Sequence, residues 1–167
     1  MKEVGLRYAG AAAFLMIIVF LVSYYIGVHP FIEMSHLFFD FFIYGLVIYF
    51  ALNEFKTVKN EGILHFWQGM SIGFFVNIFS FGIYMVFLFL IMNFDENILI
   101  TYQQQAVDFL KIKSIQYIEG FGEEQYQSQL ETIQETTILE MTLMGGVKKF
   151  ISAMLITPVL SILKRKT

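Results

Sequence analysis

Long uncharged runs divide the chain into segments that predict membrane-spanning helices. The first run, residues 8–28, has 21 residues, which at about 1.5 Å per helical residue matches a hydrocarbon core of roughly 30 Å. The second predicted span is 30–52, because Pro30 suits the first turn of a helix and Asn53 and Glu54 follow its last apolar residues. The third, 66–92, offers 27 uncharged residues and is therefore expected to tilt or to protrude.

A fourth span is predicted near the end of the chain. The uncharged run there, residues 150–163, is too short to cross a bilayer by itself. The span must therefore extend back across Lys148 and Lys149 to Met141. A short amphipathic helix lying on the membrane surface is the competing interpretation of this segment. We expect four transmembrane helices, about 8–28, 30–52, 66–92 and 141–163, in a single integral membrane domain covering 1–167.

The polar segment 95–140 between the third and fourth spans has a helical pattern. Apolar positions predict one helix over 97–118, a break at residues 119–122 and a second helix from Glu123. Because no glycine or proline intervenes between Gly122 and Gly145, the second helix is expected to continue into the fourth span, projecting about 25 Å from the membrane. Its apolar residues form a narrow seam that includes Tyr126, Leu130, Ile133 and Met141. Two interpretations are open: the two helices pack on each other and on the membrane surface, or the seam docks another chain.

The positions of lysine and arginine predict how the chain is threaded. Basic residues precede the first predicted span, lie between the second and third, and follow the fourth, whereas the 95–140 segment holds nine acidic residues and only Lys111 and Lys113. Cytoplasmic loops are enriched in lysine and arginine. We therefore expect cytoplasmic N- and C-termini and an extracytoplasmic helical hairpin between spans 3 and 4.

Composition supports this all-α membrane fold and excludes several classes of function. Hydrophobic residues make up 57% of the chain and charged residues 15%, and there is no cysteine, so disulfides and thiol chemistry are excluded. A net charge of −3 provides no basic surface for nucleic acid. Hydrolase elbows, zinc-protease motifs and phosphate-binding glycine loops are absent from the sequence. We predict no cofactor and no aqueous enzyme chemistry.

Four ionisable residues near the start of the second predicted span could share a helical face. His29, Glu33, His36 and Asp40 are spaced four, three and four residues apart. Imidazole and carboxylate groups suit a transition metal, which makes Glu33, His36 and Asp40 a candidate metal site. The alternative is a polar helix start at the membrane interface, because Pro30 disfavours helical geometry at His29.

Two further constellations point to helix packing. Asp40 and Lys148 or Lys149 lie at similar depths on two spans of the same direction, and we expect a structural ion pair, since unpaired charges are costly in lipid. The alternative is that both lysines extend to the interface. Gly69 and Gly73 form a GxxxG motif, which we interpret as packing within the chain, homodimerisation being the alternative.

The assembled features resemble a domain-of-unknown-function family of small four-span bacterial inner-membrane proteins. The matching parts are the opening 2–10, the NEFKTVKNEGILHFWQGMSIG junction over 53–73, the acidic helices and the GGVKKFISAMLITPVLSILKRK tail over 145–166. The resemblance implies a bacterial cytoplasmic membrane location and a fold, but no activity. We predict a non-enzymatic accessory or assembly subunit that contacts membrane lipid and presents its acidic cap to an envelope protein. A small transporter or oligomeric channel using Asp40 and Lys148 is the alternative, and a lipid-modifying enzyme ranks third.

Overall fold

Four long helices form the body of the protein. The computed structural model describes residues 1–32 and 35–165, and within that part the chain is helical with no strand. The long helices are α1 (Lys2–Ile26), α2 (Ser35–Glu54), α3 (Phe66–Phe94) and α7 (Ile138–Lys164). Each is long and apolar enough to cross a membrane. The predicted all-α fold with four candidate spans is therefore confirmed.

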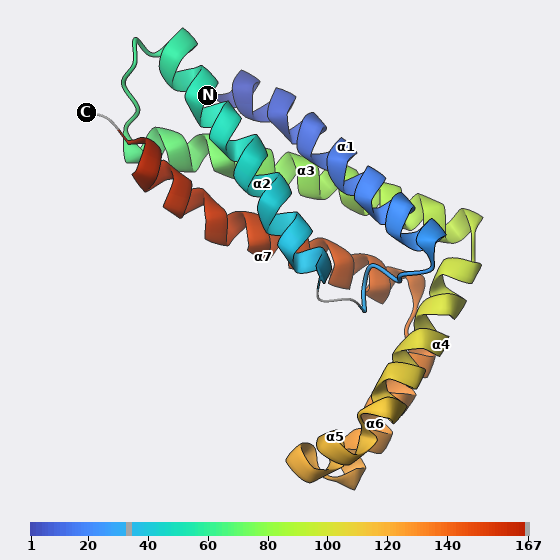
Figure 1. Cartoon of the computed structure of the whole chain (residues 1–167). Coiled ribbons are helices and arrows are strands. Elements are labelled where there is room, and N and C mark those ends of the chain that lie inside the picture. Colours follow the sequence, from blue (N-terminus) through green and yellow to red (C-terminus); the bar gives the residue numbers. More distant parts are fainter. Residues whose placement is uncertain (33–34, 166–167) are drawn as a thin grey trace.

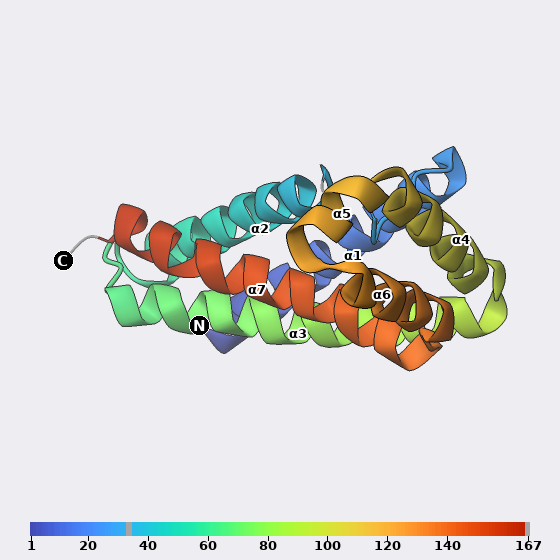
Figure 2. The same cartoon turned by 90° about the horizontal axis from the view of Figure 1, so that it is seen from below.

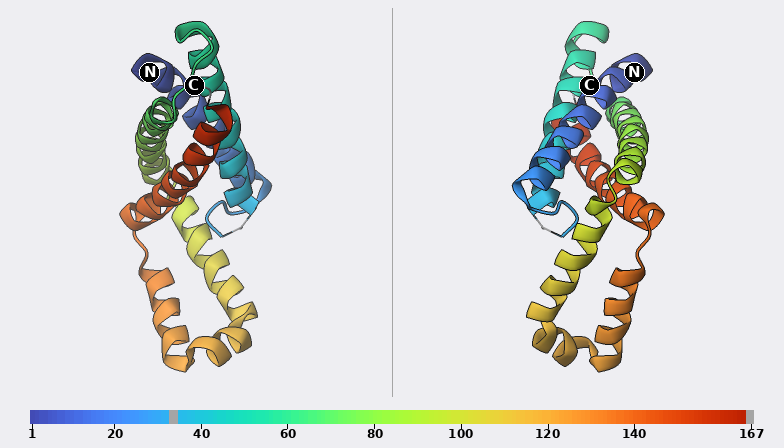
Figure 3. Two further views of the ribbon diagram at one scale, coloured as in Figure 1. Left: turned by 90° about the vertical axis from the view of Figure 1, so that its left-hand side faces the viewer. Right: turned by 90° about the vertical axis from the view of Figure 1, so that its right-hand side faces the viewer.

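The four helices pack side by side into one bundle. Around the bundle the neighbours are α1, α3, α7 and α2, and α2 closes the ring against α1 (Figures 1 and 2). Both chain termini lie at one end, here called the terminal end, and the polar helices α4 to α6 are attached at the opposite hairpin end (Figures 1 and 3). The core between the helices contains large buried side chains such as Phe20, Tyr44 and Tyr84.

The second span begins later than the proline suggested. The α1 helix ends at Gly27, whose positive φ of 88° and two backbone hydrogen bonds to the last turn terminate the helix. The chain then turns, with the Ile32 amide donating to the His29 carbonyl at 3.1 Å, and α2 starts only at Ser35. Pro30 therefore belongs to this turn. At the other end a π-helical turn, η1 (Phe55–Lys59), continues α2 toward the third span.

The polar segment forms a hairpin of two helical arms. The first arm consists of α4 (Asn97–Ile112) and α5 (Ser114–Phe121), and the second is α6 (Glu123–Glu135). Gly122, with φ 89°, separates them. The hairpin leaves the bundle at a steep angle to its long axis (Figures 1 and 3), so it does not extend the spans in a straight line.

The expectation of one continuous helix from Glu123 into the fourth span is wrong. α6 ends at Glu135, and α7 starts after Thr137. The Thr137 hydroxyl accepts from the Glu140 amide, while the Glu140 carboxylate accepts from the Thr137 amide. This reciprocal capping box fixes a new helix start, and it lets the hairpin arm change direction where it joins the bundle.

The hairpin arms cover much of the apolar seam of the second arm. Tyr126 and Ile133 are buried where α6 packs on α4 and α5, and the rings of Tyr117 and Tyr126 lie 6.2 Å apart. Leu130 packs against the same cluster, whereas Met141 is fully buried in the first turn of α7. The seam is thus satisfied largely by contacts within this chain.

Candidate functional site: a charged cavity in the bundle

A buried ion pair joins α2 to α7. The Lys149 ammonium donates to a carboxylate oxygen of Asp40, and the exposed fractions of the two side chains are 9% and 7%. The same ammonium lies 4.6 Å from the ring centroid of Tyr84 on α3. Removing either partner would leave a buried charge without compensation, which is strongly unfavourable. The pair and the ring therefore connect three of the four long helices.

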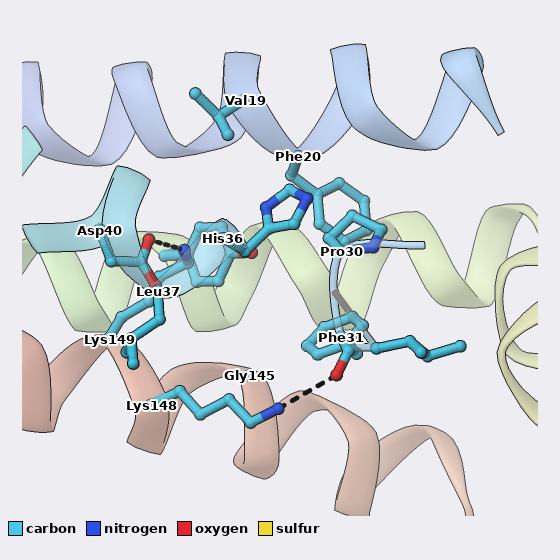
Figure 4. Close-up of a pocket in the computed structure, with 12 residues that line it drawn as sticks. Val19, Phe20, Pro30, Phe31, His36, Leu37, Asp40, Gly145, Lys148 and Lys149 are labelled. Atoms are coloured by element: carbon cyan, nitrogen blue, oxygen red, sulfur yellow. Dashed lines mark hydrogen bonds and ion pairs between the residues drawn. The ribbon is translucent and has the colours of Figure 1, made fainter. Parts of the chain in front are cut away.

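Lys148, the preceding residue, has a different partner. Its ammonium donates to the backbone carbonyl of Phe31 at 3.1 Å, whereas Lys149 reaches toward Asp40 (Figure 4). Consecutive residues on a helix point about 100° apart, which explains why only one lysine reaches the carboxylate. The partner of Lys148 is neutral, so its positive charge is not cancelled there.

These groups line a cavity between α1, α2 and α7 beneath the turn over 29–32. Its volume is about 270 Å³. Most of the wall is apolar and includes Val19 and Phe20 from α1, Phe31 from the turn and Leu37 from α2, with the charged groups gathered on α2 and α7 (Figure 4). An apolar cavity with a few convergent polar groups is the usual form of a small-molecule site.

Two adjacent glycines set the position of α7 beside the cavity. A β-carbon added to Gly145 would collide with the ring of Phe31, and one added to Gly146 would collide with Met85. Small residues permit close approach of helices in membranes. The glycine pair therefore allows α7 to pack closely enough for Lys148 to reach the turn.

The turn over 29–32 is fastened to the hairpin through His29. The ring Nε2 lies 3.0 Å from the Ile98 carbonyl, and Nδ1 is 3.5 Å from the amide of Phe31. A neutral ring with its proton on Nε2 satisfies both contacts, donating to Ile98 and accepting from Phe31. Burial lowers the pKa of His29 below its ordinary value of 6.5. The expectation that His29 shares a face of the second span is wrong, because α2 begins six residues later.

The candidate metal residues are only partly described. His36 and Asp40 both line the cavity from α2, whereas Glu33 lies outside the described residues. Within 1–32 and 35–165, no three histidine or acidic residues are grouped so that they could hold a metal ion. The geometry thus centres on the Asp40–Lys149 pair and Lys148.

The two glycines of the GxxxG motif face α7. A β-carbon on Gly69 would come within 2.7 Å of the Ser161 hydroxyl, and one on Gly73 would collide with Thr157. The structure therefore places Gly69 and Gly73 in the interface between α3 and α7 of the same chain.

Sequence reasoning missed the apolar walls and the turn that closes the cavity. The proline before Phe31 predicts the start of a helix there, but the structure places Phe31 in a turn, where the residue is buried over the bundle. Tyr84 was one aromatic residue among many in a span. The adjacent glycines at 145 and 146 were the available signal for close packing at this point, but they do not identify the residues on the other side.

Comparison with known proteins identifies the family but not an activity. Neither curated proteins nor solved structures give a match to this chain. A family described as "Protein of unknown function (DUF4199)" matches residues 7–166, so the match includes most of α1, the other three long helices and the hairpin. The chain therefore belongs to the DUF4199 family of proteins of unknown function.

Proposed function

We propose that this protein is an accessory or assembly subunit of the bacterial cytoplasmic membrane that docks an envelope partner through its hairpin. Both termini lie in the cytoplasm, the hairpin lies on the opposite side, and the bundle serves as the membrane anchor. The docking surface is the hairpin tip, defined as Phe109, Ile112, Ile115 and Phe121.

The distribution of basic residues supports this orientation. The terminal end of the bundle gathers the basic residues that flank the spans. There Arg7 pairs with Glu54, Lys59 lies 3.9 Å from Glu3, and Lys56 donates to the Lys164 carbonyl. Lysine and arginine near span ends favour the cytoplasmic side.

The observation that carries the proposal is the exposure of the hairpin tip. Ile112, Ile115 and Phe121 remain 83%, 72% and 69% exposed, although the rest of the hairpin buries its apolar seam. These residues belong to the polar segment and lie outside the four candidate spans. Grouped exposed apolar residues on a polar element are typical of a binding surface.

The charge of the hairpin indicates the chemistry of the partner. The 95–140 segment holds nine acidic residues and two lysines, and one of these, Lys113, lies 4.4 Å from the Phe109 ring centroid. A strongly acidic arm is repelled by an anionic bilayer surface and attracted by a basic protein surface. We therefore expect a protein partner with an apolar groove for the tip and with lysine or arginine residues that face the acidic arms.

Site-specific photocrosslinking in native membranes tests this proposal. A photoreactive residue at Ile115 is expected to give one discrete protein adduct, and the same residue at the exposed Gln127 of α6 serves as the matched control. Salt shortens the distance over which exposed charges interact. Because the attraction is electrostatic, the yield of the adduct should fall as the salt concentration is raised from 50 to 500 mM.

A second variant separates specific docking from chance proximity. Ile112→Glu introduces a charge into the tip and should abolish the Ile115 adduct, whereas Glu131→Gln on the other arm should leave it intact. Adducts formed only with lipid, or equally from Gln127, would contradict the proposal. Transport through Asp40 and Lys148 stays the alternative prediction.

A further inference from the structure

We propose that the cavity beside Lys148 binds an amphiphile with a single negative charge, such as a fatty carboxylate. The Lys148 ammonium holds the anionic head group, and the apolar walls cover the first part of the tail. This site is separate from the hairpin tip and does not depend on the proposed docking function.

The charges of the cavity select the charge of the ligand. Asp40 and Lys149 neutralise each other through a direct contact, so among the described lining residues Lys148 contributes the remaining formal charge. An ammonium has three N–H donors, and the Phe31 carbonyl accepts one of them. The other two are available to oxygen atoms of a carboxylate or phosphate, and charge-assisted hydrogen bonds of this kind are stronger than neutral ones.

The same charges exclude other ligand classes. A cation in the cavity would meet the ammonium groups of Lys148 and Lys149, and Asp40, the carboxylate among the described lining residues, is already paired. A head group with two negative charges would place its second charge near the Asp40 carboxylate, which repels it. No second unpaired ammonium among the described lining residues would compensate this charge. A single negative charge is therefore favoured over both alternatives.

The walls favour an apolar tail. Val19 and Phe20 provide apolar surface opposite the lysines, and Phe31 adds apolar surface beside Lys148 (Figure 4). Burial of each methylene of a tail against these walls favours binding. The volume of about 270 Å³ lies just below the range of roughly 300 to 1,000 Å³ found for complete drug-sized ligands. It fits a head group with a short tail. Leu37, which is 41% exposed, marks the side on which a longer tail would leave the bundle.

Binding of decanoate to the full chain tests the proposal. The protein is reconstituted in nanodiscs of phosphatidylcholine, and calorimetry measures saturable binding above that of empty nanodiscs. Lys148→Met should weaken decanoate binding at least tenfold, while Lys148→Arg should retain it because the positive charge remains. Lys111→Met on the hairpin is the matched control and should bind as the unmodified protein does. Decanol, which lacks the charge, should bind at least tenfold more weakly than decanoate.

A second variant guards against a folding defect in the first. Val19→Phe fills the cavity from α1 without altering either lysine, and it should weaken decanoate binding while the thermal midpoint stays within a few degrees. Nanodiscs containing phosphatidylglycerol distinguish the natural source of the anion. Competition by phosphatidylglycerol assigns the site to a lipid phosphate, and its absence assigns it to a free carboxylate; both outcomes support the site. Equal binding by the unmodified protein, Lys148→Met and Val19→Phe, or no saturable binding at all, would overturn it.

Discussion

Reversing the Asp40–Lys149 pair provides a sharp test of the helix arrangement. Asp40→Lys should destabilise the protein severely, because the introduced ammonium would then face that of Lys149 in the bundle. Adding Lys149→Asp should restore stability, since the reversed pair can span the same gap between α2 and α7. Adding Lys148→Asp instead should not restore it, because Lys148 points toward the turn and contacts Phe31.

The magnitude follows from the burial of both partners. Each side chain is less than a tenth exposed, so solvent screens the charges weakly. Removing one member of a buried pair costs about 3 to 5 kcal/mol. A loss of about 3 kcal/mol changes the folding equilibrium constant more than a hundredfold, since each 1.4 kcal/mol corresponds to a factor of ten.

Two measurements report the effect of these variants on folding. Accumulation in membranes, read by a fluorescent protein fused after the C-terminus, reports the folded fraction in cells, and the thermal midpoint in mild detergent reports stability after purification. The swap with Lys149 should recover most of both signals, and the swap with Lys148 should recover neither. Equal rescue by the two swaps, or no effect of Asp40→Lys alone, would refute the assignment of this pair.

Two other predictions concern packing and pH. Gly73→Leu should separate α3 from α7 by collision with Thr157 and lower the stability by about 1 to 3 kcal/mol, measured by the thermal midpoint. Gly82→Leu is the control and should be nearly neutral, because a β-carbon at Gly82 meets no neighbour. Equal losses in the two variants would contradict the interface. For His29 the pKa is lowered in the folded protein, so stability is greatest above pH 6.5 and falls as the pH drops toward the lowered pKa, by no more than about 1.4 kcal/mol per unit. The rate of amide hydrogen exchange in the turn over 29–32, corrected for the intrinsic rate, should therefore rise as the pH is lowered from 7.5 to 5.5. His29→Gln should abolish this rise. An unchanged corrected rate in the unmodified protein would contradict the prediction.

Much of the fold could be predicted from the sequence because lipid imposes a simple rule. A span must be apolar over a fixed length and must satisfy its own backbone hydrogen bonds, so uncharged runs locate α1 and α3 well. The ends of a span are harder to predict where apolar residues continue beyond the helix into a turn. Pro30 and Phe31 read as the start of a span, but they form a turn that packs over the bundle. Apolar pattern alone does not distinguish these two uses.

The break before α7 and the choice of lysine show two other limits. Thr137 and Glu140 carry a capping-box signal in the sequence, whereas the absence of glycine and proline between Gly122 and Gly145 predicts an unbroken helix. Whether Lys148 or Lys149 meets Asp40 depends on the rotation of α7. That rotation is set by the contacts of Gly145 and Gly146 with side chains on other elements, so it is a tertiary property that periodicity does not contain.

The most direct measurement of the proposed membrane arrangement is the accessibility of single introduced cysteines. The chain has no native cysteine, so Ile115→Cys at the hairpin tip and Val58→Cys in the turn after α2 each provide one reactive group. Both positions are more than two-thirds exposed. In intact spheroplasts a membrane-impermeant maleimide should label position 115 at once and position 58 only after permeabilisation. Labelling of position 58 but not 115 would reverse the topology, and labelling of both without permeabilisation would contradict four spans with the hairpin and the junction on opposite sides.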